Sequence, residues 1–233
     1  MDPNSPVISS GSAPASAATS AENANKGVSE RKDWTERKDW TERKDWTERK
    51  DQKDRNDPYM SSQYTFGNRV RRQLWSIVWI FLYRPSPRVA HAWRACLLRC
   101  FGAKLGPHCR FYPASRVWAP WNLRCEDTVM VADGAELYNP APMVLASHAI
   151  VSQGAYLCGA THDTNDPSFP VLSFPMRLGR YAWVAARACV SPGVNLGDGA
   201  ILGLASVATK DLEPWSIYAG SPARKVKDRT PFA

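Results

Sequence analysis

A six-residue period in the C-terminal third of the chain limits its fold more than any other feature. Apolar residues recur at every sixth position: Leu178, Val184, Val190, Leu196, Leu202 and Ala208. This period is poor for a helix, because successive members would point in different directions around a 3.6-residue turn. Six is a multiple of two, so in extended strands all the period-six aliphatic residues lie on the same face. A small residue follows each member, as Gly179 and Gly197 do, and allows a sharp corner, which predicts a parallel β-helix.

The same period extends toward the N-terminus with two interruptions. It begins at Leu105, and its phase shifts by two residues before Cys125 and again before Leu145. We therefore predict a mainly β domain over residues 105–213, with about five coils of about 18 residues each.

Two segments depart from the period. Between Leu157 and Leu178 it is absent, and we expect residues 158–177 to leave the solenoid as an unstructured excursion, which is typical of a functional loop. Residues 214–233 form a basic C-terminal tail, in which Pro214 and Pro222 are expected to prevent ladder pairing.

The chain before the solenoid divides into two parts. Residues 1–57 are first rich in Ser, Ala, Asn and Pro and then repeat Glu-Arg-Lys-Asp-Trp-Thr, so we interpret them as a disordered low-complexity tail. The tandem repeat could also bind a partner. Residues 58–104 are expected to form a helical cap, with helices over 68–83 and 87–101 separated by Pro85 and Pro87. Such a cap would cover the open end of the β-helix, and an interfacial membrane element is a compatible alternative.

Charge is concentrated in one region. The net charge is +8, and the segment between Tyr59 and Cys125 holds eleven Arg or Lys residues and no acidic residue. This local field implies an anionic partner, either phosphate groups of a ligand or a membrane surface, and we do not expect nucleic acid. No signal peptide opens the sequence, and the apolar stretch Leu74–Tyr83 is too short to span a bilayer. We expect a cytoplasmic protein, with the inner face of the membrane as a second location.

Cysteine and histidine give few metal-site signals. The six cysteines form no C-x-x-C pair, and we interpret them as buried small hydrophobic residues in a reducing compartment. No histidine lies at ligand spacing from them, so no metal is expected. His162, in the excursion beside Asp163 and Asp166, is a candidate general base because its pKa is ordinarily near neutrality. The alternative is a surface histidine without a role.

Three stretches together carry a family resemblance: FGAKLG (101–106), IVSQGAYLCGATHDTNDPSFP (150–170) and VSPGVNLGDGAILGLASVATKDLEPWSIYAGSPARKV (190–226). With the hexapeptide run, they resemble the hexapeptide-repeat acetyltransferases. The likeness is to the colanic-acid-biosynthesis type, which is related to maltose and galactoside O-acetyltransferases. It covers roughly residues 68–229, and its motifs occur in the family's order.

The resemblance implies a left-handed parallel β-helix and a homotrimer with active sites between subunits. The implied activity is acetyl-CoA-dependent O-acetylation of a sugar hydroxyl in polysaccharide or exopolysaccharide biosynthesis, with His162 as the general base. Residues implied to contact acetyl-CoA are Leu204, Ala205, Thr209, Lys210, Arg224 and Lys227. Asn139 and Asp163 are implied to contact the acceptor. The sequence departs from the family at Ala186 and Leu204, where a polar residue and a smaller residue are common, which puts CoA affinity in doubt.

Two other functions stay open at this point. A zinc hydrolyase resembling the γ-class carbonic anhydrases needs three histidines, and only His148 and His162 are candidates in the later coils. A non-catalytic β-helix used for assembly is the second. The basic stretch further suggests a lipid-linked glycan acceptor, with peripheral membrane contact through residues 69–104. The sequence does not identify the sugar or the hydroxyl.

Overall fold

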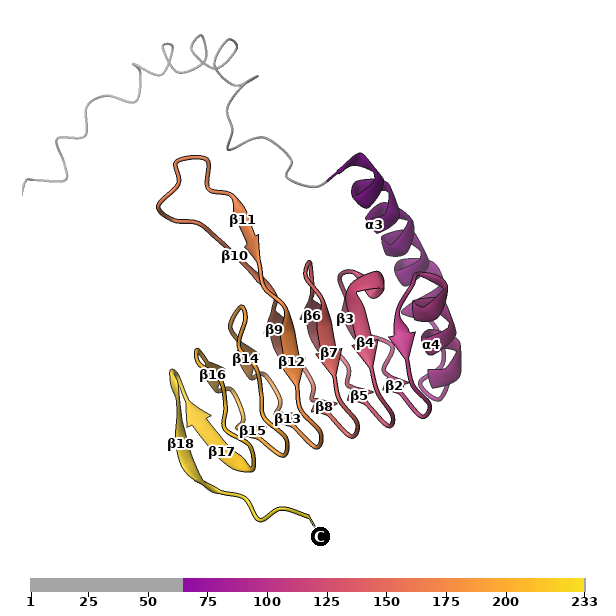
Figure 1. Ribbon diagram of the computed structural model, residues 1–233. Helices are drawn as coiled ribbons and strands as arrows, with labels where there is room; N and C mark the ends of the chain where they lie inside the picture. Colours follow the sequence, from indigo (N-terminus) through magenta and orange to yellow (C-terminus); the bar gives the residue numbers. More distant parts are fainter. Residues whose placement is uncertain (1–64, 233) are drawn as a thin grey trace, which may run out of the picture. The chain divides into compact units, whose positions relative to one another are not determined.

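A solenoid of short parallel strands follows two helical segments in the computed structural model, which describes residues 65–232 (Figure 1). The interpretation of residues 1–57 as disordered concerns residues outside this range. The strands form three parallel sheets along the solenoid, named sheets A, B and C in the order in which the chain visits them. The predicted parallel β-helix is confirmed.

Each sheet takes one short strand from successive coils. Sheet A contains β1 (Lys104–Leu105), β4 (Leu123–Cys125), β7 (Met143–Leu145) and β12 (Met176–Leu178). Sheet B contains β2 (Arg110–Phe111), β5 (Met130–Val131), β8 (Ile150–Val151), β13 (Trp183–Val184), β15 (Ile201–Leu202), β17 (Ser216–Gly220) and β18 (Ala223–Asp228). Sheet C contains β3 (Arg116–Val117), β6 (Glu136–Tyr138), β9 (Tyr156–Cys158), β14 (Cys189–Val190) and β16 (Val207–Ala208). A 3-10 turn, Pro120–Asn122, precedes β4.

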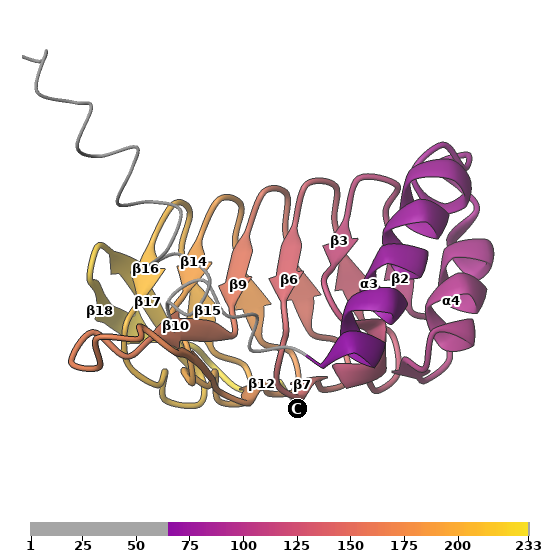
Figure 2. The ribbon, with the colours of Figure 1, turned by 90° about the horizontal axis from the view of Figure 1, so that it is seen from above.

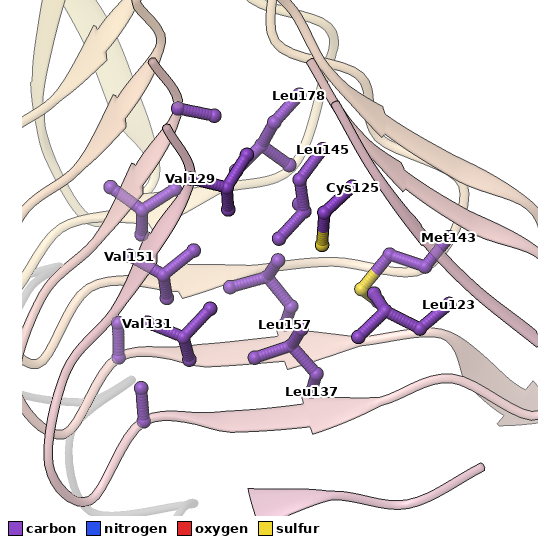
Figure 3. Close-up of a cluster of buried hydrophobic side chains, with 14 of the residues drawn as sticks. Leu123, Cys125, Val129, Val131, Leu137, Met143, Leu145, Val151, Leu157 and Leu178 are labelled. Atoms are coloured by element: carbon purple, nitrogen blue, oxygen red, sulfur yellow. The ribbon is translucent and has the colours of Figure 1, made fainter. Parts of the chain in front are cut away.

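The period-six residues form the core. Parallel register places Cys125 beside Leu145 and Leu145 beside Leu178, so the members of one sheet stack in a column. Figure 3 shows side chains from the three sheets pointing toward one another inside the solenoid. Most members, including Leu145 and Leu178, are completely buried. Each buried aliphatic side chain contributes roughly 1.5–3 kcal/mol relative to an exposed one.

Close approach between coils, and not backbone strain, explains the small residue after each aliphatic one. A Cβ atom on Gly179 would lie 2.5 Å from the backbone nitrogen of Asp198 in the next coil. Positive φ angles occur later, at the third residue after the aliphatic one, where His148 (64°), Tyr181 (55°) and Arg187 (58°) adopt them. The sequence pattern was correct, and its physical reason is steric contact between coils.

Every irregularity in coil length falls at one corner, between sheets C and A. Both two-residue shifts precede a strand of sheet A, β4 or β7, and the long excursion lies between β9 and β12. Sheet A continues after β12 through parallel bridges from Leu178 to Leu196 and from Leu196 to Leu212. Six levels of sheet A result, one more than the five coils predicted.

The helical cap lies across the first coil. Helix α3 (Phe66–Val78) continues into a π-helical segment, η3 (Trp79–Tyr83), and α4 (His91–Cys100) follows. The second helix begins later than predicted because the residues after Pro87 form a turn. Within residues 65–232, no helix combines the length and the apolar character needed to cross a membrane.

The cap donates hydrogen bonds to the carbonyl groups of the first coil. Trp75 Nε1 lies 2.7 Å from the Val117 oxygen, and Trp79 Nε1 lies 2.9 Å from that of Ser115. Arg94 Nε lies 2.6 Å from the Phe111 oxygen. Unpaired strand edges promote aggregation, so these contacts protect the open end, as predicted for a cap.

Two expectations drawn from the sequence are wrong. The C-terminal tail does not leave the ladder, since β17 pairs in parallel with β15 and β18 pairs antiparallel with β17. Pro214 and Pro222 lie outside both strands and remove no ladder hydrogen bond. Cysteines are not all buried: Cys109 and Cys125 are, whereas Cys96 and Cys100 are exposed on α4.

Replacing Arg94 by methionine should destabilise the protein by about 3 kcal/mol. Arg94 is fully buried, and its guanidinium also donates to the oxygens of Pro87 and Arg88. Its acceptor at Phe111 belongs to a buried residue, and a buried carbonyl that loses its donor costs roughly 1–3 kcal/mol. Urea denaturation measures the change. The control is Arg110→Met, at an exposed position of the first coil, which should shift stability by less than about 0.5 kcal/mol. Equal stability of both variants would contradict the capping role.

Candidate active site

The excursion is an ordered antiparallel ribbon, contrary to the expectation of an unstructured loop. Strand β10 (Ala160–His162) pairs with β11 (Val171–Ser173), and the ribbon stands out from the solenoid (Figure 1). The backbone N–H of Phe174 donates to the oxygen of Gly159 at 2.9 Å and closes its base. Because paired strands supply the backbone hydrogen bonds, the segment needs no contact with the solenoid face to be ordered.

His162 is the last residue of β10, at the end of the paired strands nearer the turn, and its side chain is exposed. Its Nδ1 lies 2.8 Å from the carbonyl oxygen of Phe169. A carbonyl oxygen only accepts hydrogen bonds, so Nδ1 carries the hydrogen of the neutral ring. Nε2 then holds the lone pair, which is the state that a general base requires.

Phe169 fixes the imidazole ring in a second way, which the sequence did not reveal. Its ring stacks on that of His162, with centroids 4.5 Å apart and planes 14° from parallel. Phe169 has a φ of 48°, and its N–H donates to the oxygen of Asp166 at 2.8 Å. The period of the solenoid carries no signal for this residue, since it lies in the ribbon's turn.

Asp166 shapes that turn. Its carboxylate accepts hydrogen bonds from the N–H and the hydroxyl of Ser168, at 2.8 and 2.7 Å. These bonds hold the pKa of Asp166 below its ordinary value. The residue therefore supports the position of Phe169, and its carboxylate does not contact His162 directly.

The two residues expected at the acceptor have different surroundings. The Asp163 carboxylate accepts from the N–H of Asn165 at 2.9 Å, beside His162 in the ribbon. Asn139 is fully buried, and its amide donates to and accepts from the backbone of Ala119, both at 2.9 Å. The expectation that Asn139 contacts the acceptor therefore disagrees with the structure, because both ends of its amide already hold two coils together.

The residues expected to contact acetyl-CoA lie at two corners that flank sheet C. Leu204 and Ala205 form the corner between sheets B and C, and Arg224 on β18 pairs with Ala219 beside it. Thr209 and Lys210 form the corner between sheets C and A, directly after β16.

All of these side chains are exposed, and Leu204 is 71 % exposed on its turn. Lys227 is also exposed but lies farther along β18, opposite Ile217. The structure thus places Leu204, Ala205 and Arg224 at one corner. Thr209, Lys210 and Lys227 lie elsewhere.

His162 and the Thr209–Lys210 turn share one corner of the solenoid. The ribbon leaves that corner two coils before Thr209 and Lys210, and Figures 1 and 2 both show its tip displaced toward the C-terminal coils. Phe174 at its base lies next to Gly193 of the intervening coil. The ribbon that carries His162 and the exposed Lys210 therefore lie at one corner, whereas the exposed Leu204 and Arg224 lie on the other side of sheet C.

The pair of histidines considered for zinc lies at different corners. His148 is at the corner between sheets A and B and stacks on Tyr181, with ring centroids 4.7 Å apart. Over the described part of the chain, no three His, Cys, Asp or Glu side chains lie close enough together to hold a metal ion.

Solved structures share this fold. The hexapeptide-repeat acetyltransferase VCA0836 from Vibrio cholerae superposes with a TM-score of 0.66 at 18 % identity, over 72 % of this chain and 95 % of that one. A galactoside acetyltransferase in complex with coenzyme A superposes with a TM-score of 0.67 at 18 % identity, over 72 % and 86 %. No family model matches the sequence.

Sequence similarity identifies the family. The chain is an acyltransferase of the hexapeptide-repeat class, with the left-handed parallel β-helix of that class. Within it, the chain belongs to the family of WcaF, an acetyltransferase assigned to colanic acid biosynthesis. It is 35 % identical to WcaF of Escherichia coli (strain K12) over 163 residues, which are 70 % of this chain and 90 % of that relative. The identity to WcaF of Shigella flexneri is the same.

The neutral His162 ring should carry its hydrogen on Nδ1. Free histidine favours Nε2–H, so the hydrogen bond to Phe169 should reverse the preference. Nitrogen-15 NMR of histidine-labelled protein above pH 8 distinguishes the two tautomers, with exposed His108 as the internal reference. A spectrum in which both rings show Nε2–H would contradict the proposed orientation of the base.

Proposed function

We propose that the protein transfers the acetyl group of acetyl-CoA to a sugar hydroxyl of a polysaccharide or its precursor, with His162 as the general base. The observation that carries this proposal is the hydrogen bond from His162 Nδ1 to the Phe169 carbonyl, which leaves Nε2 free to take a proton. Family membership supports the acetyl donor, because the relatives are named acetyltransferases. A galactoside O-acetyltransferase of Escherichia coli also matches, over 56 residues at 36 % identity.

The reaction is a direct transfer. Nε2 takes the proton of the acceptor hydroxyl while the hydroxyl oxygen bonds to the thioester carbonyl carbon. The C–S bond then breaks, and the thiolate of coenzyme A takes the proton from Nε2. The products are an O-acetyl ester and free coenzyme A, and His162 returns to its starting state. The backbone carbonyl of Phe169 stabilises the imidazolium that forms between the two steps, since Nδ1–H remains its donor.

The exposed residues of the last coils suit acetyl-CoA as the donor substrate. Arg224 and, farther along β18, Lys227 supply cations for its phosphate groups, and Lys210 lies on the other side of sheet C from Arg224. Leu204 and Ala205 offer an apolar corner for the pantetheine arm, and coverage by this arm would remove the exposed surface of Leu204 from water.

His162→Ala should lower the rate of acetyl transfer by about 100- to 10,000-fold, the range typical of a lost general base. Release of free thiol from acetyl-CoA, screened over sugar acceptors, measures the rate. Coenzyme A should raise the melting temperature of the variant and of the parent protein equally. His108→Ala, at an exposed corner away from the ribbon, should have the parent rate.

Three outcomes would redirect the assignment. Unchanged turnover of His162→Ala would remove its role as the base. The absence of any thermal shift with coenzyme A would favour a non-catalytic assembly protein. Stoichiometric zinc in the purified protein would favour the hydrolyase.

We further propose a homotrimer with its active sites between subunits. Outward side chains of sheet B form an apolar row that a second copy can bury: Met130, Ile150, Trp183, Ile201 and Ile217. Light scattering should give a molar mass three times the 26.0 kDa of one chain. A monomer at micromolar concentration would exclude the trimer.

We also propose that the cap makes peripheral contact with an anionic membrane, where a lipid-linked glycan would be the acceptor. The outer face of α3 and η3 carries an exposed apolar stripe at helical spacing: Phe66, Val70, Leu74, Ile77 and Phe81. Phe66 is 74 % and Phe81 70 % exposed. The opposite face, with Trp75 and Tyr83, packs on the solenoid.

Positive charge near this stripe favours an anionic membrane as its binding partner. Arg69 and Arg84 lie along or directly after the same segment, which contains no acidic residue. An apolar face bordered by arginines is typical of a helix that lies in the headgroup region of an anionic leaflet. The corresponding location is the inner face of the cytoplasmic membrane.

Leu74→Ser combined with Phe81→Ser should abolish flotation of the full chain with anionic vesicles. Both side chains are exposed, so the loss would not reflect unfolding. Vesicles of phosphatidylglycerol and phosphatidylcholine should float the parent protein, less at high salt and least without the anionic lipid. Val226→Ser, at an equally exposed apolar position on β18, is the control. Equal flotation of the parent protein and both variants would exclude the stripe as the membrane contact.

A further inference from the structure

The outward face of sheet A carries a row of cations that the candidate site does not use. Parallel register places Lys104 beside Arg124, Arg124 beside Val144, and Val144 beside Arg177. All three cations are exposed on the outward face of sheet A, where β7 with Val144 separates the strands of Arg124 and Arg177. Neighbouring strands lie about 4.8 Å apart, so the backbone positions of the three cations are separated by about 5 Å and about 10 Å along the row.

These cations have no carboxylate partner in the described residues. The ion pairs there involve Arg88, Arg180 and Lys225 instead. Glu126, directly after β4, accepts hydrogen bonds from the N–H and hydroxyl of Ser147, at 3.0 and 3.1 Å. Like charges opposite each other on adjacent strands destabilise a sheet. Repulsion within the row therefore destabilises sheet A unless a bound anion offsets the repulsion.

A groove of about 640 Å³ runs over the row. Its lining includes Lys104, Gly106, Arg124, Glu126, Val144 and Arg177. This volume is in the range of small-ligand sites. The groove has no large exposed apolar side chain, in contrast to the stripe on α3, so its surroundings suit a polar anion better than a membrane.

The row ends at the base of the ribbon that carries His162. Arg177 lies four residues after Ser173, which pairs with Ala160 at the start of β10. His162 pairs with Val171, six residues before Arg177, so the extended chain between them spans at most about 20 Å. Residues expected at acetyl-CoA lie on the opposite side of the ribbon, in the last coils.

We propose that Lys104, Arg124 and Arg177 bind an anionic saccharide along sheet A, with carboxylate or phosphate groups on successive sugars. Binding would align the chain so that a hydroxyl of a sugar past Arg177 reaches His162. The role of this surface as an acceptor site rests on the proposed function, whereas the binding itself does not. A single diphosphate could contact Lys104 and Arg124 together but would leave Arg177 unused, because its two charges lie close together.

The test is calorimetric titration of the full chain without acetyl-CoA. The probe is a hexamer of galacturonate, and maltohexaose is the neutral control of the same length. We expect binding of the uronate alone, weakening as salt rises. Arg124→Gln with Arg177→Gln should weaken it at least tenfold. The matched control is Arg110→Gln, an exposed cation on sheet B outside the groove, which should bind as the parent does. His162→Ala should also bind normally.

Several results would overturn the proposal. These are failure of the uronate to bind, equal binding of maltohexaose, and unchanged affinity of the double variant. Complete displacement by equimolar inorganic pyrophosphate would assign the row to a diphosphate group instead. If the uronate binds as expected while His162→Ala keeps full acetyl transfer, the function of His162 is refuted and the binding row stands.

Discussion

Parallel pairing between successive coils is the constraint on which the rest of the structure depends. Each coil must return to the same three sheets, one strand spacing of about 4.8 Å farther along, with its aliphatic residues in register. Corners that pack closely against the next coil, as at Gly179, tolerate no side chain. Added length is accepted at the corner between sheets C and A, where all changes in coil length occur. This corner is therefore where the ribbon that carries His162 can be inserted without disturbing the core.

The first coil imposes a second requirement, since no earlier coil pairs with it. Its carbonyl groups accept hydrogen bonds from Trp75, Trp79, Arg94 and Arg99 of the cap. Part of the basic character between Tyr59 and Cys125 is thus structural, and only part of it is available to an anionic partner. The structure separates the two groups: Arg94 is buried in the cap, whereas Arg124 is exposed on sheet A.

Much of the architecture and one part of the site could be predicted from the sequence. The period of six gave the strands, and its absence marked the segment that holds His162. The role of Phe169 could not be predicted, because its stacking and its carbonyl contact depend on the turn of the ribbon. Asn139 was expected to contact the sugar acceptor, but its amide forms hydrogen bonds with the backbone of Ala119. Pro214 and Pro222 suggested an unpaired tail, although both lie outside the strands that they separate.

By itself, the sequence determined that the chain forms a capped parallel β-helix and that its interruption carries a histidine, because strand periodicity and turn chemistry are local properties. Only the tertiary structure decided which nitrogen of His162 is available, since the partner of the other nitrogen lies across the ribbon. It alone also brought Lys104, Arg124 and Arg177 into one row. These residues are far apart in the chain, and they become neighbours because each further coil adds one strand to the same sheet.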